Sequence, residues 1–265
     1  MVTDALVFLV HAVATRARAA AGAILTVIAA IGRLVRSATA PASAGWLGRR
    51  VAVQQLRFTA VQAIPLVAAV AACLGATVTL EAHARAAQLG LSETVARTLG
   101  IIVVRDAGPL LAAVIVTARS GTAIAAEVAT SRLLGETDAL AGMGIDLVQF
   151  YVIPRIIGVA IATALLTVYF VAITLGVAVA IASLRGIATV SAYTDTLRGV
   201  LRPDDLVWSA VRGGAFGAGV AWLSAAVGLR GRGGQADVPR AVTRAAVRSI
   251  TLLAVTTAVF VAIWS

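Results

Sequence analysis

TARSGTAIAAEVATSRLLGETDALAGMGIDLVQFYVIPR, the stretch from Thr117 to Arg155, is a charged island between apolar segments and holds three arginines and four acids. Within it, Leu133, Leu140 and the Met143/Gly144 step follow one another at seven and then three to four residues, which places them on one face of a helix. Glycines interrupt the same stretch, and each weakens a helix interior by roughly 1 kcal/mol. The pattern predicts a short amphipathic helix, turned back on itself, between two membrane spans. An ordinary solvated loop would give the same pattern.

The composition of the chain excludes an ordinary soluble domain. Of its 265 residues, 60% are hydrophobic and only 13% are charged, with a mean hydropathy of +0.97. A soluble domain carries about 25% charged residues. Helices satisfy their own backbone hydrogen bonds in lipid, so we expect an all-α integral membrane protein. The net charge of +10 fits membrane orientation better than nucleic-acid binding, because the arginines fall between the apolar runs.

The sequence offers no catalytic or cofactor-binding centre. All 22 basic residues are arginine, so the chain lacks the lysine of a P-loop. Any ATP must therefore be bound and hydrolysed by another chain. His11 and His83 lie far apart without a carboxylate cluster, which argues against a metal site. No nucleophile–base arrangement is evident. We expect no enzyme activity and no cofactor on this chain.

The lengths of the uncharged runs divide the chain into an N-terminal segment and a membrane domain. Residues 1–50 contain two uncharged runs of eleven and fourteen residues, too short for the roughly 20 that cross a membrane. We expect this region to lie in the membrane interface as an amphipathic segment. Residues 51–265 form the membrane domain, with about five spans. The expected spans are Phe58–Leu80, Thr98–Ala118, Ile156–Leu184, Leu206–Leu229 and Ser249–Trp264.

The distribution of arginines predicts the orientation of these spans. With the N-terminus in the cytoplasm, the cytoplasmic segments hold 15 arginines and the outer segments hold five. This satisfies the tendency of basic residues to stay on the cytoplasmic side. Five spans then place the C-terminus on the outer side, and they place the amphipathic stretch of residues 127–146 in the cytoplasm.

Three charged residues fall inside the expected spans: Arg105 and Asp106 in the second, and Arg212 in the fourth. A lone charge near the bilayer centre costs at least about 2.5–3.5 kcal/mol, so such residues face a partner or a watery cavity. Asp106 and Arg212 carry opposite signs at similar expected depths. We expect them to meet, either on a transport pathway or as a purely structural ion pair. Arg105 should point about 100° away, towards the cavity or the outer mouth.

Four separate blocks of sequence resemble one known family, and they occur in that family's order. They are VRDAGP (104–109), ARSGTAIAAE (118–127), ETDALAGMGID (136–146) and VIPR (152–155). These blocks are similar to the MlaE/YrbE family, the permease subunits of bacterial ABC transporters that move lipids together with MCE-domain proteins. Further matches are Gln55 with Leu56 and VPRAVTRAAVRS (238–249), so the resemblance covers the chain from about residue 50 onward. Leu147 departs from it, because many members carry proline there.

The resemblance implies a transport assembly in the bacterial inner membrane. A second permease copy, identical or not, would complete a dimer, and each copy would dock one ABC ATPase subunit. An MCE-domain assembly on the outer side would exchange lipid with the permease. Related permeases also have an acid in the RDAGP-like motif and a basic residue at the position of Arg212. Arg105, Asp106 and Arg212 are therefore candidate residues of the lipid pathway.

The cytoplasmic stretch would then be the helix that couples the permease to its ATPase. Leu133, Leu140 and Met143 are the expected apolar anchors in a groove of that partner. The charged residues expected at the contact are Glu127, Arg132, Glu136 and Asp138. An alternative function is a stand-alone secondary carrier or channel, in which intramembrane Asp106 would serve as a proton site.

Overall fold

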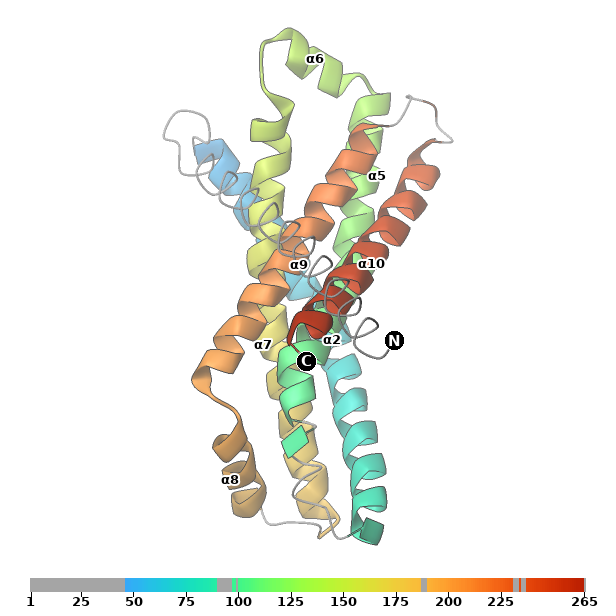
Figure 1. Cartoon of the computed structure of the whole chain (residues 1–265). Helices are drawn as coiled ribbons and strands as arrows, with labels where there is room; N and C mark the ends of the chain where they lie inside the picture. Colours follow the sequence, from blue (N-terminus) through green and yellow to red (C-terminus); the bar gives the residue numbers. More distant parts are fainter. Residues whose placement is uncertain are drawn as a thin grey trace, which may run out of the picture.

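The structure is a computed structural model that describes residues 46–89, 97–98, 100–186, 190–230, 234 and 237–264. Of the expected interfacial region, residues 1–45 lie outside the described part of the chain. Helices are the only regular secondary structure among the described residues, as Figure 1 shows. The elements are α2 (Trp46–Leu89), η1 (Val103–Ala107), α4 (Gly108–Val116), η2 (Thr117–Gly121), α5 (Thr122–Leu133), α6 (Glu136–Gly142), η3 (Val148–Val152), α7 (Ile153–Leu184), α8 (Val190–Val200), α9 (Pro203–Leu229) and α10 (Asp237–Trp264).

Five stretches among the described residues are long and apolar enough to cross a membrane. They are Arg50–Ala82, Gly100–Leu133, Ile153–Leu184, Asp204–Leu229 and Asp237–Ala262. The prediction of an all-α membrane protein with about five spans is therefore confirmed. The short helices α6 and α8 lie at opposite ends of the bundle (Figure 1).

Three of the expected spans have clearly different bounds in the structure. The first, expected at Phe58–Leu80, is part of α2, which begins at Trp46 and ends at Leu89. The second helical stretch does not end at Ala118 but continues through η2 and α5 to Leu133. Arg119 does not interrupt it, because its side chain donates to Gln62 of α2 instead of requiring water. The fifth helix begins at Asp237, well before the expected Ser249. The arginines before Ser249 lie on the exposed face of this helix, so their charge does not prevent it from forming.

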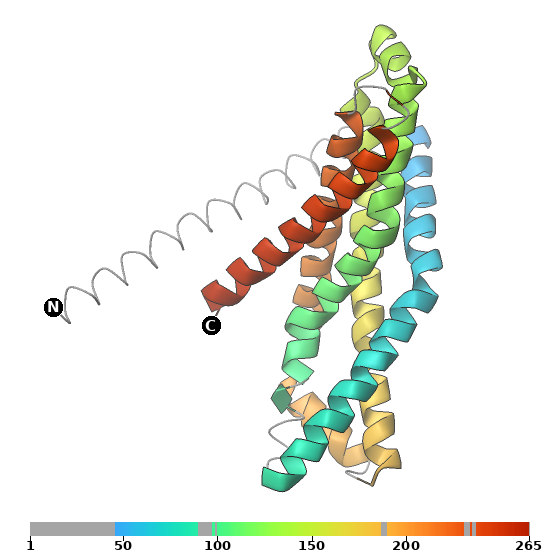
Figure 2. The ribbon, with the colours of Figure 1, turned by 90° about the vertical axis from the view of Figure 1, so that its right-hand side faces the viewer.

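The helix α7 is the centre of the bundle, because α2 and α9 both pack along its length. Ala63 and Val67 of α2, Phe170 of α7 and Ala221 of α9 all belong to one buried cluster. Around it, α4, α5 and α10 pack against α9. Figure 2 shows α10 diverging from the rest of the bundle towards its C-terminal end.

Small residues allow α9 to approach α7 closely. A Cβ atom at Gly213 or Gly217 of α9 would overlap the side chains of Thr167 and Thr163 of α7, respectively. The two threonine hydroxyls donate to carbonyl oxygens of their own helix at 2.8 Å, so both are satisfied within α7. Close backbone approach of this kind is how helices associate in lipid. It fixes the position of Arg212, which directly precedes Gly213.

Candidate functional site

The π-helical segment η1 positions two of the three intramembrane charges. Its N-terminal residue, Val103, accepts a hydrogen bond from the N–H of Gly108, five residues on, as in a π-helix. Pro109 follows and has no N–H, so it cannot donate to the carbonyl of Arg105 as a residue four positions later would in an α-helix. The local sequence therefore leaves the Arg105 carbonyl available as an acceptor for another part of the protein.

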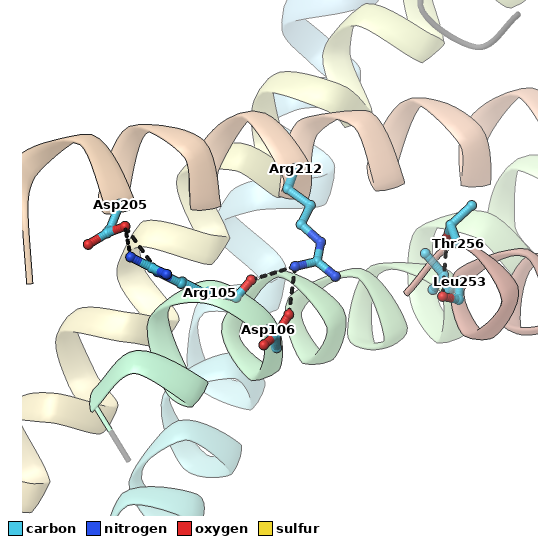
Figure 3. A network of polar contacts seen from close by, with 6 residues as sticks. All are labelled: Arg105, Asp106, Asp205, Arg212, Leu253 and Thr256. Atoms are coloured by element: carbon cyan, nitrogen blue, oxygen red, sulfur yellow. Dashed lines mark hydrogen bonds and ion pairs between the residues drawn. The ribbon is translucent and has the colours of Figure 1, made fainter. Parts of the chain in front are cut away.

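Arg212 of α9 uses this acceptor and pairs with the neighbouring acid. Its Nη1 atom lies 2.7 Å from Oδ1 of Asp106 and 2.7 Å from the carbonyl oxygen of Arg105 (Figure 3). The side chain of Arg212 is 11% exposed and that of Asp106 is 38% exposed. The structure thus brings together Asp106 and Arg212, the two opposite charges whose meeting the sequence predicted.

Arg105 points to a different partner, which the sequence analysis missed. Its Nη2 atom lies 2.9 Å from Oδ1 of Asp205, near the start of α9 (Figure 3). The other carboxylate oxygen of Asp205 accepts from the backbone N–H of Arg202 and so caps α9. Two ion pairs therefore join η1 to α9. Asp205 follows Pro203 and Asp204 in the pattern of a helix start, and that pattern was the available signal for it.

Two aromatic rings surround the guanidinium of Arg212. Its Cζ atom lies 3.9 Å from the ring centroid of Phe260 in α10 and 5.6 Å from that of Phe216 in α9. The Nε and Nη2 atoms are buried and have no hydrogen-bond partner among the described residues. These two atoms form the edge of a guanidinium that binds a carboxylate or phosphate in a bidentate manner. Phe260 was not predicted, because the register of α10 against α9 cannot be derived from hydropathy.

The expected coupling helix is divided in two by a turn. Residues Glu127, Arg132 and Leu133 belong to α5, the end of the second helical stretch, and not to a separate helix. Gly135 has a φ of 74°, in the left-handed region that favours glycine, and α6 begins directly after it. Glu136, Asp138 and Leu140 lie on α6, and Met143 is its C-cap. The predicted turn is present, and it divides the helical part of residues 127–146 between α5 and α6.

This turn changes which apolar side chains face outward. Met143 is 66% exposed and Leu134, which the sequence analysis did not single out, is 67% exposed. Leu133 and Leu140 are each partly buried, so the expected three-residue stripe is not one exposed face. The seven-residue spacing places residues on one face only within an uninterrupted helix, and the turn at Gly135 separates Leu133 from Leu140. Glu136 and Asp138 are exposed on α6, beside the exposed leucine and methionine.

Two expected coupling residues instead hold α5 to the bundle. Glu127 forms an ion pair with Arg155 at the start of α7, with 2.5 Å between Oε1 and Nη2. Arg132 donates from Nη1 to the carbonyl oxygen of Leu229, the last residue of α9, at 2.5 Å. Carbonyls at a helix C-terminus lack intrahelical donors, and a cation there is favourable. The base of the α6 turn is therefore fastened to both α7 and α9. No group of three or more His, Cys, Asp or Glu that could hold a metal occurs among the described residues.

These features define a helical membrane protein with a charged network inside a five-span bundle and a short helix protruding at one end. Residues 52–263 match the family Permease MlaE, and the chain belongs to this family. The match begins close to the boundary at residue 50 that the sequence blocks indicated, and the predicted resemblance is confirmed.

Three relatives illustrate the range of this similarity. A probable ABC transporter permease protein of Rickettsia felis is 29% identical over 203 residues, covering 76% of this chain and 78% of the relative. One from Synechocystis is 24% identical over 206 residues, covering 78% of each. The chloroplastic protein TRIGALACTOSYLDIACYLGLYCEROL 1 of Arabidopsis thaliana is 26% identical over 201 residues, covering 76% of this chain and 57% of the relative.

Proposed function

We propose that this chain is the transmembrane permease subunit of an ABC transporter that moves phospholipids or related lipids between the cell membrane and an MCE-protein assembly. Membership of the Permease MlaE family and the ABC permease names of its relatives support the permease role. The Arabidopsis relative carries the name of a diacylglycerol lipid, which supports a lipid as the substrate.

The observation that best supports a lipid phosphate as the ligand is the edge of the Arg212 guanidinium formed by Nε and Nη2. Its Nε and Nη2 atoms are buried without an acceptor in the described part of the chain, while its Nη1 is held by Asp106 and the Arg105 carbonyl. A lipid phosphate supplies two oxygens for such an edge, and charge-assisted pairs of this kind are among the strongest hydrogen bonds. We assign the edge to the headgroup, and we assign Phe260 to cover it when no lipid is bound.

Force from the ATPase enters through α6. Leu134 and Met143 would bury their exposed apolar side chains in the partner, and Glu136 and Asp138 would contact its rim. The helical stretch Gly100–Leu133 connects this end to the charged network. From Leu133 to Asp106 it runs about 40 Å at 1.5 Å per residue. Because α5 is fastened to α7 and α9, a displacement of α6 would move all three helices together.

The remaining parts of the proposed assembly are partners of this chain. ATP binds to a separate ABC ATPase, because the chain has no lysine for a P-loop. A second permease copy forms the dimer, and the MCE protein meets the outer side. The protein lies in the bacterial inner membrane with its N-terminus in the cytoplasm and its C-terminus outside, as the arginine distribution favours.

The test is reconstitution of the permease with its ATPase and MCE protein in liposomes that contain labelled phospholipid. We expect labelled lipid to pass between the liposome and the MCE protein only when ATP is hydrolysed. Passage by the permease alone, driven by a proton gradient without nucleotide, would establish the alternative carrier that uses Asp106. Lipid analysis of the purified complex identifies the species retained.

A further inference from the structure

One face of α2 gathers positive charge without any acid. Arg50 and Arg57 are both exposed, and their spacing of seven residues places them two turns apart on one side of the helix. The first 80 residues of the sequence hold seven arginines against one acid, Asp4, and the first acid of α2 is Glu81. Glu81 lies 24 residues beyond Arg57, so no acid of α2 is close enough to neutralise this face.

Arg119 of η2 reaches the same face from the neighbouring helix. Its Nη2 atom donates to Oε1 of Gln62, and its Cζ atom lies 5.4 Å from the ring centroid of Phe58. The Nη1 atom of Arg119 is buried and has no hydrogen-bond partner among the described residues. A buried donor without an acceptor costs about 1–3 kcal/mol, more when it is charged. Arg119 is thus held beside Phe58 and Gln62 of α2, where its charge adds to that of Arg50 and Arg57.

A hollow of about 890 Å³ lies along this face. The described residues that line it are Arg50, Val53, Gln54, Arg57, Phe58, Val61 and Gln62. Val53 is exposed between the two arginines, and beyond Arg57 the exposed hydrophobic side chains continue with Val61, Ile64 and Leu66. From Arg50 to Leu66 the helix rises about 24 Å. This order, from positive charge to hydrocarbon, matches the order of headgroup and acyl chain in a lipid.

We propose that this hollow binds the phosphate headgroup of an anionic lipid, from the leaflet on the side of α6. The start of α2 and the helix α6 lie towards the same end of the bundle in Figures 1 and 2. Arg50 and Arg57 meet the phosphate, Arg119 adds positive charge beside Gln62 at the rim, and the acyl chains follow Val61 along α2. The site is distinct from the network at Asp106, about 20 Å further along the second helical stretch. It does not depend on the proposed transport.

The charges of the chain favour a lipid over other occupants. Residues 1–45 of this chain hold four arginines and one acid, so they would repel the basic face. A lipid phosphate is present at high density beside every membrane protein, and each arginine near an anionic surface contributes attraction.

The experiment compares two double variants in nanodiscs made of phosphatidylcholine with one-fifth phosphatidylglycerol. Arg50→Gln with Arg57→Gln removes two charges of the hollow. Arg240→Gln with Arg244→Gln removes two exposed arginines from the first turns of α10, and this helix begins towards the same end of the bundle as α6 (Figure 1). After extraction, the phosphatidylglycerol retained per protein is measured by mass spectrometry. We expect a loss of about 5- to 30-fold for the first pair and less than twofold for the second. Equal losses, or none for the first pair, would overturn the proposal.

A photo-crosslinking residue at Val61 identifies the occupant directly. The same nanodiscs are illuminated, and the mass of the crosslinked peptide is determined. A phosphatidylglycerol adduct, lost in the Arg50→Gln/Arg57→Gln background, supports the site. An adduct with residues 1–45, with another protein, or equally with phosphatidylcholine would show that the hollow is not an anionic-lipid site. Adding inorganic phosphate should not reduce the adduct; displacement by phosphate at millimolar concentration would point to a free anion instead.

Discussion

Arg212 donates a 2.7 Å hydrogen bond to the main-chain carbonyl of Arg105, 107 residues earlier in the chain. In a regular α-helix this carbonyl would accept from the residue four positions on, which here is Pro109 and has no N–H. The proline therefore makes a backbone acceptor available inside the bundle. Arg212 is therefore positioned by two neighbouring groups of η1, the Arg105 carbonyl and the Asp106 carboxylate. A simple ion pair would provide only the second of these contacts.

The first prediction concerns exchange of the two charges, Asp106→Arg with Arg212→Asp. An aspartate at position 212 cannot donate to the Arg105 carbonyl or offer a bidentate edge to a phosphate. One charge-assisted hydrogen bond contributes about 1.5–3 kcal/mol, so we expect ATP-driven lipid transfer to fall about tenfold or more in a complex that still assembles. The control exchanges the exposed pair Asp195 and Arg198, 3.9 Å apart on α8, and should leave transfer unchanged. Full recovery of transfer in the first exchange would indicate a purely structural pair.

The second prediction concerns the aromatic cover of Arg212. Phe260→Ala removes the ring that lies 3.9 Å from the guanidinium, so water and reagents should reach Nε and Nη2. We expect modification of Arg212 by phenylglyoxal, followed by peptide mass spectrometry, to become several times faster. Phe216→Ala, whose ring lies 5.6 Å away, should have a smaller effect. Equal rates in all three proteins would mean that Phe260 does not shield the arginine.

The third prediction tests the close seam between α7 and α9. A methyl group at Gly217 would overlap Thr163, and overpacking of this kind costs about 1–3 kcal/mol. We expect Gly217→Ala to lower the Tm of the detergent-solubilised protein. Gly176→Ala in α7 is the matched control, because no atom lies within 4 Å of the added Cβ. Thr163→Ala should restore part of the lost Tm in the double variant, and absence of any such rescue would contradict the seam.

The fourth prediction concerns docking of the ATPase on the protruding turn. Leu134→Asp places a charge on a side chain that is 67% exposed, so it should disrupt a partner's apolar groove without unfolding the permease. We expect the ATPase to be lost on co-purification. Leu184→Asp, at an 84% exposed leucine at the other end of α7, should retain it. Co-purification of the ATPase with both variants would exclude this surface as the docking site.

The fifth prediction tests the orientation in the membrane. Cys73 is the single cysteine of the chain and is replaced by alanine first. A cysteine introduced at Met143, beside α6, should then react with an impermeant maleimide only from the cytoplasmic side. A cysteine at Leu184 should react only from outside, because the two positions lie at opposite ends of the bundle. The reverse pattern would mean that the arginine distribution misassigned the orientation.

The sequence predicted the features that depend on local pattern. Apolar run length gave five spans, and the energetic cost of isolated intramembrane charge predicted that Asp106 and Arg212 would meet. The glycine content of the charged stretch predicted a turn, which the structure places at Gly135. Each of these inferences needs only a few neighbouring residues or a strong energetic rule, which explains why sequence alone sufficed.

The features that sequence reasoning missed depend on contacts between distant segments. The charge of Arg119 led hydropathy to end a span there, yet its Nη2 donates to Gln62 of another helix and the helix continues. Leu134 is exposed because α5 ends at Leu133. If the helix ended one residue earlier or later, a different set of side chains would share its exposed face. Phe260 covers Arg212 only because α10 crosses α9 at that level. Hydropathy contains no information on crossing points, so these contacts required the structure.

The π-helical geometry of η1 has a consequence for how the charged network can open. A π turn contains more residues than an α turn, so rewinding it to α geometry rotates the residues within it about the helix axis. Asp106 lies inside η1, whereas Arg212 lies on the regular helix α9. A change of helical pitch in η1 alone would therefore turn the carboxylate away from the arginine while α9 stays in place. The network is sensitive to torsion of one helix, and the two helices need not separate for the ion pair to break.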